Sequence, residues 1–224
     1  MQPVDDARFL VCYIHVARQS TSAVIDAMRS FRSASSSETC HIACLQRDGD
    51  CYSNQFVVFI VANDPPQLLH CTASASFSAL STAIDAARIA PTIIKKFRSV
   101  TTGPVSDSSE FMRLTQGVCA ATVTVAHLDV IPSIPGNVDR AVALLAREAS
   151  ARQERRSVDG CLMFLALQQT DRANHFTFVQ GWSSAEAKTS YDEGAAKAFK
   201  DEFYGMGPLV GGCPWDEQFH RCAI

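Results

Sequence analysis

Three residues in the second half of the chain, His127, Asn174 and Trp182, are the candidates for catalysis. His127 lies in an apolar, strand-like run. A histidine that faces an enclosed cavity could accept a proton from a bound ligand, because its unperturbed pKa is about 6.5. The alternative is a hydrogen-bonded structural histidine near a strand end. For Trp182, the alternative to a site residue is a core aromatic side chain.

The run from Asn174 to Trp182 is expected to be a strand, so its side chains alternate between two faces. Asn174, Gln180 and Trp182 then share one face and would form an amphipathic pocket wall. The sequence does not say whether that face lines a cavity or meets helices. Tyr191 follows on a helix, where it would donate to a substrate oxygen or else lie at the surface. The candidate substrate-binding residues are His175, Phe176, Phe178, Gln180 and Tyr191.

The elements that would position these residues occur twice along the chain. The segment that starts at Asn54 with the pattern Asn-x-Phe recurs at Asn174. Each copy reads as strand, helix, strand, strand, helix, strand. In the first copy the expected elements are strands over 9–17, 39–46 and 54–62, a helix over 21–33 and a poorly defined helix within 71–90. In the second they are strands over 121–131, 161–168 and 176–182, a helix over 138–151, and a helix that begins with a capping box at Ser183 and Glu186.

The fold class predicted from this order is α+β, with two tandem ferredoxin-like βαββαβ units. Each unit has a four-stranded antiparallel sheet with its helices on one face. The other face is apolar and bare, so we expect the two units to pair as an α+β barrel. The stretch from Thr101 to Gln116, which contains Gly103, Pro104 and four consecutive Ser or Asp residues at 106–109, is the predicted linker. The expected domains are residues 1–105, a degenerate copy, and 117–224.

Composition indicates an ordinary globular protein that does not bind nucleic acid. Of the 224 residues 47% are hydrophobic and 19% charged, and the net charge is -3. The densest basic cluster, Arg152, Arg155 and Arg156, is read as a solvated helix end. No run approaches the roughly 18 apolar residues of a membrane span. The start lacks the form of a signal peptide, so a cytoplasmic protein is expected. The nine cysteines suggest buried, reduced thiols.

Several segments of the second copy together resemble the antibiotic biosynthesis monooxygenase family. They keep the family's order and spacing for about a hundred residues. The first copy shares only the order of elements and the Asn54-x-Phe56 frame. The segments that carry the resemblance are His127–Pro132, Leu167–Thr170, Asn174–Thr177, Trp182, Lys197–Phe199, Pro208–Leu209 and Pro214–Phe219.

The resemblance implies a dimeric α+β barrel fold and an oxidation chemistry. Several members of the family oxidise quinols or polycyclic aromatic phenols with dioxygen and without metal, flavin or haem. Many members carry a glutamate where Gln180 stands, and histidines where Ser190 and Ala195 stand. The chain therefore lacks acid–base groups that its relatives have.

The leading hypothesis is a cofactor-independent monooxygenase that oxidises a quinol or aromatic phenol, with no cofactor and no metal expected. An alternative is a noncatalytic small-molecule-binding or structural α+β barrel, and a third is haem binding or degradation. The expected partners are a small aromatic or quinol substrate and no nucleic acid or membrane. The barrel would form either as a homodimer or as an intrachain pseudo-dimer.

Cys40, His41 and Cys44 are not read as a zinc site, because alternation on a strand separates His41 from the two thiols.

Overall fold

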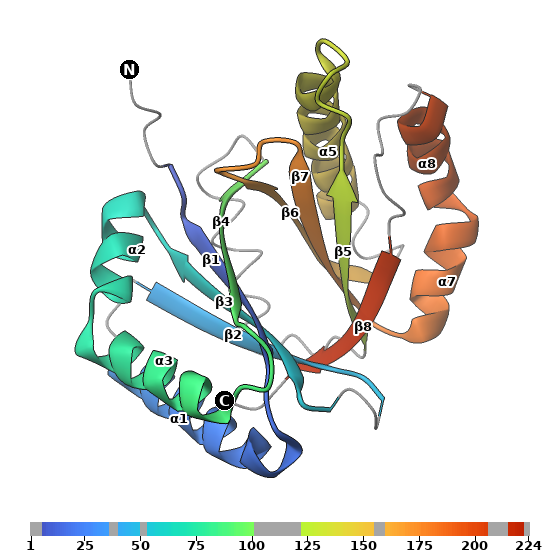
Figure 1. The fold of residues 1–224 in the computed structure, drawn as a ribbon. Helices are drawn as coiled ribbons and strands as arrows, with labels where there is room; N and C mark the ends of the chain where they lie inside the picture. The colour runs from blue at the N-terminus through green and yellow to red at the C-terminus, as the bar shows by residue number, and fades with distance from the viewer. Residues whose placement is uncertain are drawn as a thin grey trace. The chain divides into compact units, whose positions relative to one another are not determined.

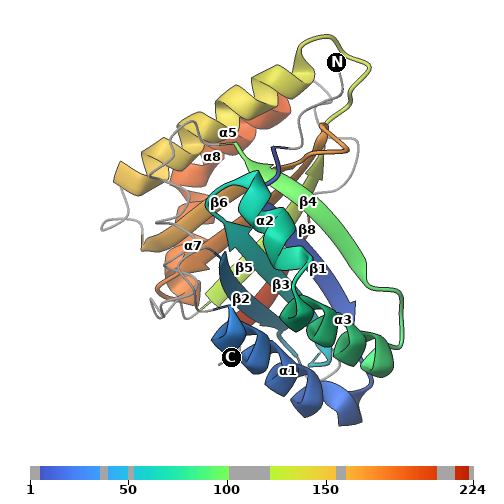
Figure 2. The same ribbon diagram turned by 90° about the vertical axis from the view of Figure 1, so that its left-hand side faces the viewer.

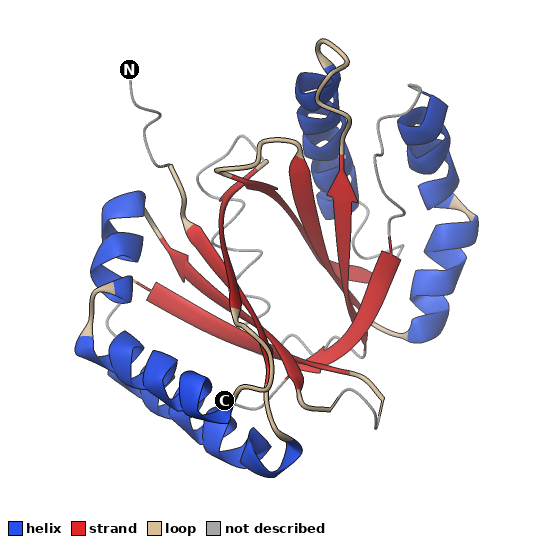
Figure 3. Cartoon of the chain, in the orientation of Figure 1, coloured by secondary structure: helices blue, strands red, loops and turns tan. Residues whose placement is uncertain are grey.

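A computed structural model describes residues 6–35, 40–49, 53–100, 122–154, 160–205 and 215–221. The chain forms two compact units. The first runs to Arg98 and also includes the end of the last strand from Phe219, and the second runs from Ser99 to Gln218. Figure 1 shows the order of the elements along the chain, and Figure 3 shows the helices and strands of each unit.

The first unit is an antiparallel sheet with the strand order β4-β1-β3-β2. This is the order of a ferredoxin-like βαββαβ unit, as the sequence predicts. At the end of β8 (Trp215–Arg221), Phe219–Arg221 pair with β2. The elements of the first unit are β1 (Phe9–His15), η1 (Arg18–Ser20), α1 (Thr21–Ala34), β2 (Cys40–Arg47), β3 (Gln55–Ala62), α2 (Pro65–Thr72), α3 (Ala75–Ala87) and β4 (Ile93–Ser99).

The helices α1, α2 and α3 lie together on one face of this sheet (Figures 1 and 2). Alternate strand residues turn toward them, including Leu10 and Ile14 of β1 and Val58 of β3. From α1, Val24 and Met28 complete this core, at the spacing of one helix face. The sequence predicted one poorly defined helix within 71–90. The structure has two, because Asp64 caps α2 ahead of two prolines and Ser74 caps α3.

The second unit repeats the first with the strand order β8-β5-β7-β6. Its core lies between this sheet and the helices, where β5, β6 and β7 residues such as Leu128, Phe164 and Phe176 pack against Leu144 and Leu145 of α5. The elements of this unit are β5 (Thr122–Asp129), α5 (Asn137–Glu154), β6 (Cys161–Gln169), β7 (His175–Trp182), α7 (Ala185–Glu193), α8 (Ala195–Gly205) and β8.

The tandem repeat is confirmed down to the hydrogen bonds of equivalent side chains. Asn54 donates from Nδ2 to the Val16 carbonyl at 2.6 Å, and Asn174 donates to the Val130 carbonyl at 3.0 Å. In both hairpins a glutamine also closes the turn: Gln46 donates to the Ser53 carbonyl, and Gln168 donates to the Ala173 carbonyl at 2.6 Å. The Asn-x-Phe frame therefore marks the place where the first strand of each unit ends.

Two local predictions need correction or lie outside the described residues. The helix α7 is capped by Ser184, whose Oγ accepts from the Ala187 amide at 3.1 Å, and not by Ser183. Ser184 is the residue with extended backbone immediately before the helix, which is the geometry a cap needs. The predicted linker over Thr101–Gln116 lies outside the described residues. Within the described part of the chain, no helix is long and apolar enough to cross a membrane.

Candidate functional site

The structure decides which face of β7 meets the helices. Phe176 and Trp182 belong to the core that packs against α5, and both are fully buried. Gln180 has the same parity and contacts a side chain of α5. The wall predicted from Asn174 to Trp182 therefore faces the helices of the second unit. His175 and Thr177 point to the opposite face of the sheet.

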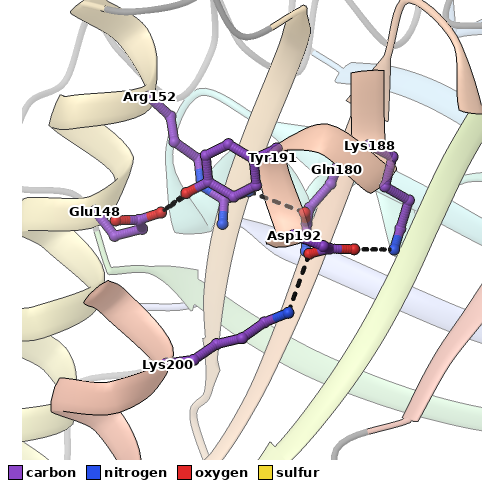
Figure 4. Close-up of polar contacts among 7 residues, drawn as sticks. All are labelled: Glu148, Arg152, Gln180, Lys188, Tyr191, Asp192 and Lys200. Carbon is purple, nitrogen blue, oxygen red and sulfur yellow. Dashed lines mark hydrogen bonds and ion pairs between the residues drawn. The ribbon is translucent and has the colours of Figure 1, made fainter. Parts of the chain in front are cut away.

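A buried arginine lies at the centre of this helix-facing side. Arg152, in the last turn of α5, is 6% exposed. Its Nε donates to Glu148 Oε1 at 2.7 Å, and its Nη1 donates to Gln180 Oε1 at 2.9 Å. The guanidinium carbon also lies 4.1 Å from the ring centroid of Phe164 and 4.4 Å from that of Tyr191. Figure 4 shows the polar part of this arrangement. A cation held among aromatic rings is suited to binding an anionic aromatic ligand.

Tyr191 and Trp182 form the aromatic wall beside this cation. Their ring centroids are 5.0 Å apart. The Tyr191 hydroxyl donates to the Glu148 carboxylate (Figure 4). Burial raises the pKa of Tyr191 well above its ordinary value and outweighs the opposing effect of the Arg152 charge. Tyr191 therefore stays a neutral hydrogen-bond donor at physiological pH.

Two buried polar groups on the same side have no hydrogen-bond partner among the described residues. They are the indole Nε1 of Trp182 and the hydroxyl of Thr124, and both side chains are fully buried. Thr124 of β5 is paired in register with Gln180 of β7, and Thr122 with Trp182. The two groups thus belong to neighbouring positions of one sheet face. A buried group without a partner costs about 1–3 kcal/mol, so a ligand oxygen that satisfied it would be bound favourably.

His127 and His175 form a second polar group on the other face of the sheet. Their rings stack with centroids 5.7 Å apart. The Nδ1 atom of His127 lies 3.0 Å from Thr177 Oγ1, and Nδ1 of His175 lies 2.9 Å from Asp129 Oδ1. Asp129 is also paired with Arg172 at 3.0 Å. A carboxylate that orients a histidine is an arrangement used for proton transfer.

The predicted site residues are therefore divided between two faces. Gln180, Trp182 and Tyr191 meet around Arg152, with Phe176 and Phe178 in the same core. His127 and His175 meet on the opposite face. Asn174 lies at the start of β7, where its amide holds the end of β5. No single cavity in this unit can be lined by both Trp182 and His127.

Sequence reasoning missed Thr124, Glu148 and Arg152. The prediction that Arg152 is a solvated cation at a helix end is wrong, because the side chain is 6% exposed and its guanidinium group packs on three aromatic rings. The spacing of Glu148 and Arg152, four residues apart on one helix, was the available signal. Such pairs are common on solvated faces, so the spacing alone did not indicate burial.

Comparisons of the sequence with models of protein families and with curated proteins find no match. Solved structures do match over nearly the whole chain. One is a protein from Lactobacillus acidophilus that is named as a proposed monooxygenase. The two sequences are 11% identical, the match covers 96% of this chain and 94% of that one, and the TM-score is 0.72. A protein from Fusobacterium nucleatum with a similar name has 10% identity, 97% and 94% coverage, and a TM-score of 0.68.

A third structure is named an anthrone oxidase-like protein. It has 15% identity, covers 98% of this chain and 92% of its own, and gives a TM-score of 0.63. The chain has the fold of these three proteins. This tandem monooxygenase-like fold confirms the resemblance seen in the sequence at the level of architecture. At 10–15% identity, this likeness shows the fold and specifies neither an activity nor a substrate.

Proposed function

We propose that the chain is a cofactor-independent monooxygenase that oxidises a quinol or an aromatic phenol with dioxygen, in the second unit, beside Arg152. The observation that carries the proposal is a pair of buried groups, Trp182 Nε1 and Thr124 Oγ1, that have no hydrogen-bond partner within the part of the chain that the structure describes. Trp182 lies beside the buried cation Arg152, and Thr124 is paired in register with Gln180, which binds that cation. These groups offer hydrogen bonds to substrate oxygens, and the cation offers stabilisation of a negative charge.

The proposed chemistry needs the protein to hold a phenolate and to exclude water. An electron-rich phenolate passes one electron to dioxygen, and the resulting phenoxyl and superoxide radicals combine at a ring carbon. The proton that the phenol gave up returns to the resulting peroxide anion, and loss of water from this hydroperoxide gives a quinone. One oxygen atom of dioxygen becomes the new carbonyl, the other leaves as water, and the substrate supplies all the electrons. Positioning and electrostatic stabilisation are the contributions expected from the protein.

Each residue of the cluster has a role in this scheme. Arg152 stabilises the phenolate, and Glu148 and Gln180 orient its guanidinium group. The Trp182 indole donates to a substrate oxygen, and the neutral Tyr191 ring stacks beside Arg152 and forms a wall. Among the described residues, the bonds to Glu148 and Gln180 use two of the five N–H donors of the Arg152 guanidinium group, and Tyr191 is a further partner. The remaining donors are the ones proposed for a ligand.

The test is oxygen uptake by the full chain with a panel of hydroquinones and polycyclic phenols, measured against autoxidation without protein. Mass spectrometry with ¹⁸O₂ should find one labelled oxygen in the quinone. Arg152→Met should lower kcat/KM by about 100-fold. Arg152→Lys, which keeps the charge without the planar fork, should give an intermediate rate. The exposed Arg140→Met on the same helix is the matched control and should leave the rate unchanged.

Two results would count against this proposal. Uptake that never exceeds autoxidation would remove the enzyme hypothesis. Loss of activity in His127→Gln together with full activity in Arg152→Met would move the site to the opposite face, where the His175–Asp129 pair would supply the base.

The rival hypothesis is a noncatalytic binding or structural protein. It is favoured by the existing partners of Arg152, because a guanidinium already held by Glu148 and Gln180 can stabilise the fold without any ligand. Binding of a nonoxidisable phenol, measured as quenching of Trp182 fluorescence, separates a binding protein from a purely structural one. Haem binding, the third hypothesis, requires a shift of the Soret band on titration with haemin.

A further inference from the structure

Two cysteines of the first unit share a pocket that the proposed function does not use. Cys40 is the first residue of β2, and Cys71 lies in the last turn of α2. The pocket has a volume of about 370 Å³, and its lining includes Cys40, Asp64, His70, Cys71 and Ser74. The helices that border it, α2 and α3, appear together in Figure 2. The pocket gives small molecules a route to both thiols.

The two cysteines line the same pocket and both are reduced. Cys40 Sγ donates to the Gln67 carbonyl oxygen at 3.7 Å, and the Cys40 and Cys71 side chains are near enough to shift each other's pKa. Cys71 Sγ is held on α2 and Cys40 Sγ on the neighbouring strand β2. The two cysteines are far apart in the sequence, so their proximity depends on the fold of the unit.

The environment makes the two thiols unequal. The hydrogen bond with Cys40 lowers the pKa of Cys71, against the opposing effect of burial. The same hydrogen bond, together with burial, raises the pKa of Cys40. Cys40 also donates its thiol proton to the Gln67 carbonyl oxygen, which favours the protonated form of Cys40. Cys71 is thus the better nucleophile of the pair.

We propose that Cys40 and Cys71 form a redox pair that is oxidised by a low-molecular-weight disulfide, with Cys71 as the attacking thiol and Cys40 as the resolving thiol. The Cys71 thiolate attacks one sulfur of the small disulfide, forms a mixed disulfide and releases one thiolate. The Cys40 sulfur then attacks the Cys71 sulfur, and the second thiolate leaves. The protein loses two hydrogens to form one disulfide, and the small disulfide is reduced to two thiols.

The experiment treats the full-length reduced protein with oxidised glutathione and maps the products by mass spectrometry of peptides. The wild-type protein should lose 2 Da and yield a peptide that links Cys40 to Cys71. In Cys40→Ser the resolving step is absent, so a glutathione adduct should accumulate on Cys71. In Cys71→Ser neither the link nor an adduct on Cys40 should form. Cys12→Ala is the control, because burial raises the pKa of Cys12 to about 12 and the thiol should take no part.

Three outcomes would overturn the proposal. They are a stable glutathione adduct on Cys71 of the wild-type protein, a disulfide that joins either cysteine to a different partner, and an absence of reaction at both positions. An adduct on Cys40 in Cys71→Ser, with none on Cys71 in Cys40→Ser, would overturn the assigned order of attack. The mapping of the wild-type protein keeps the test valid even if a variant folds poorly.

Discussion

Arg152 Nη1 donates a 2.9 Å hydrogen bond to Gln180 Oε1 and so joins the last turn of α5 to the C-terminal part of β7. The bond is made on the helix-facing side of the sheet, where Arg152 is also paired with Glu148. The amide of Gln180 accepts from the guanidinium without adding a second negative charge. The buried pair Arg152–Glu148 is therefore neutral overall, which limits the cost of burying it.

A double-mutant cycle between Arg152 and Gln180 should show that the two side chains are coupled. Gln180→Leu leaves an Arg152 donor buried without an acceptor, which we expect to lower the free energy of unfolding by about 1–3 kcal/mol. In the background of Arg152→Met the same change should cost much less, because no donor is stranded. Urea unfolding of the four proteins measures the coupling energy. A value near zero would mean that the bond does not stabilise the fold.

The link between α7 and α8 should weaken in acid. Asp192 accepts from Lys188 at 2.7 Å and from Lys200 of α8 at 3.2 Å (Figure 4). Burial by itself would raise the pKa of Asp192, but the hydrogen bonds and charges of the two lysines outweigh it and hold the pKa below its ordinary value. A lowered pKa in the folded state stabilises the protein above the unfolded pKa, and this contribution is lost as the pH falls through the folded pKa.

Asp192→Asn should therefore lower the free energy of unfolding by about 0.5 kcal/mol at pH 7, since Asp192 and its two lysine partners keep contact with solvent and such ion pairs are weak. The difference from the wild type should diminish as the pH falls below about 4, because the carboxylate is protonated first in the unfolded chain and then, at lower pH, in the folded protein. The exposed Asp201→Asn on α8 is the control. A difference that is the same at pH 7 and pH 3 would contradict the assigned cause.

Gly160 should tolerate substitution much less well than Gly136. Both have positive φ, +70° and +76°. A Cβ on Gly160 would lie 2.6 Å from Ser183 Oγ and 2.9 Å from Ala187 Cβ, whereas a Cβ on Gly136 would meet nothing within 4 Å. We expect Gly136→Ala to cost about 1 kcal/mol, from the backbone conformation alone, and Gly160→Ala to cost more, from conformation and contact together. Equal losses in thermal or urea unfolding would show that the contact is relieved without cost.

The cap of α7 can be checked with two adjacent serines. Ser184→Ala removes the oxygen that accepts from the Ala187 amide, and should cost about 1 kcal/mol. Ser183→Ala removes a hydroxyl from the exposed neighbour that the sequence had suggested as the cap, and should cost less than about 0.5 kcal/mol. If urea unfolding shows that Ser183→Ala lowers the free energy of unfolding more than Ser184→Ala does, Ser183 is the cap, as the sequence predicts.

The sequence by itself determined the order of the strands, the repeat and the sets of residues that share a strand face. It did not show that the last helical region of each unit is divided into two helices. Alternation placed Gln180 with Trp182 and His127 with Asp129, because successive strand residues point in opposite directions whatever packs on the sheet. The pattern Asn-x-Phe marked equivalent strand ends in both units, because at each end the asparagine side-chain amide donates the same hydrogen bond to a backbone carbonyl. The pairing of the two bare sheet faces stays a prediction.

Tertiary structure decided which face the helices cover and what that coverage buries. The packing of α5 on the sheet buries the face of β7 that carries Trp182. The same packing brings Arg152, which the sequence suggests is solvated, into contact with Phe164 and Gln180. Cys40 and Cys71 likewise come together only once α2 lies against β2. Periodicity fixes the neighbours of a residue within its own element. The partners of that residue on other elements depend on contacts between segments far apart in the chain, which no local pattern records.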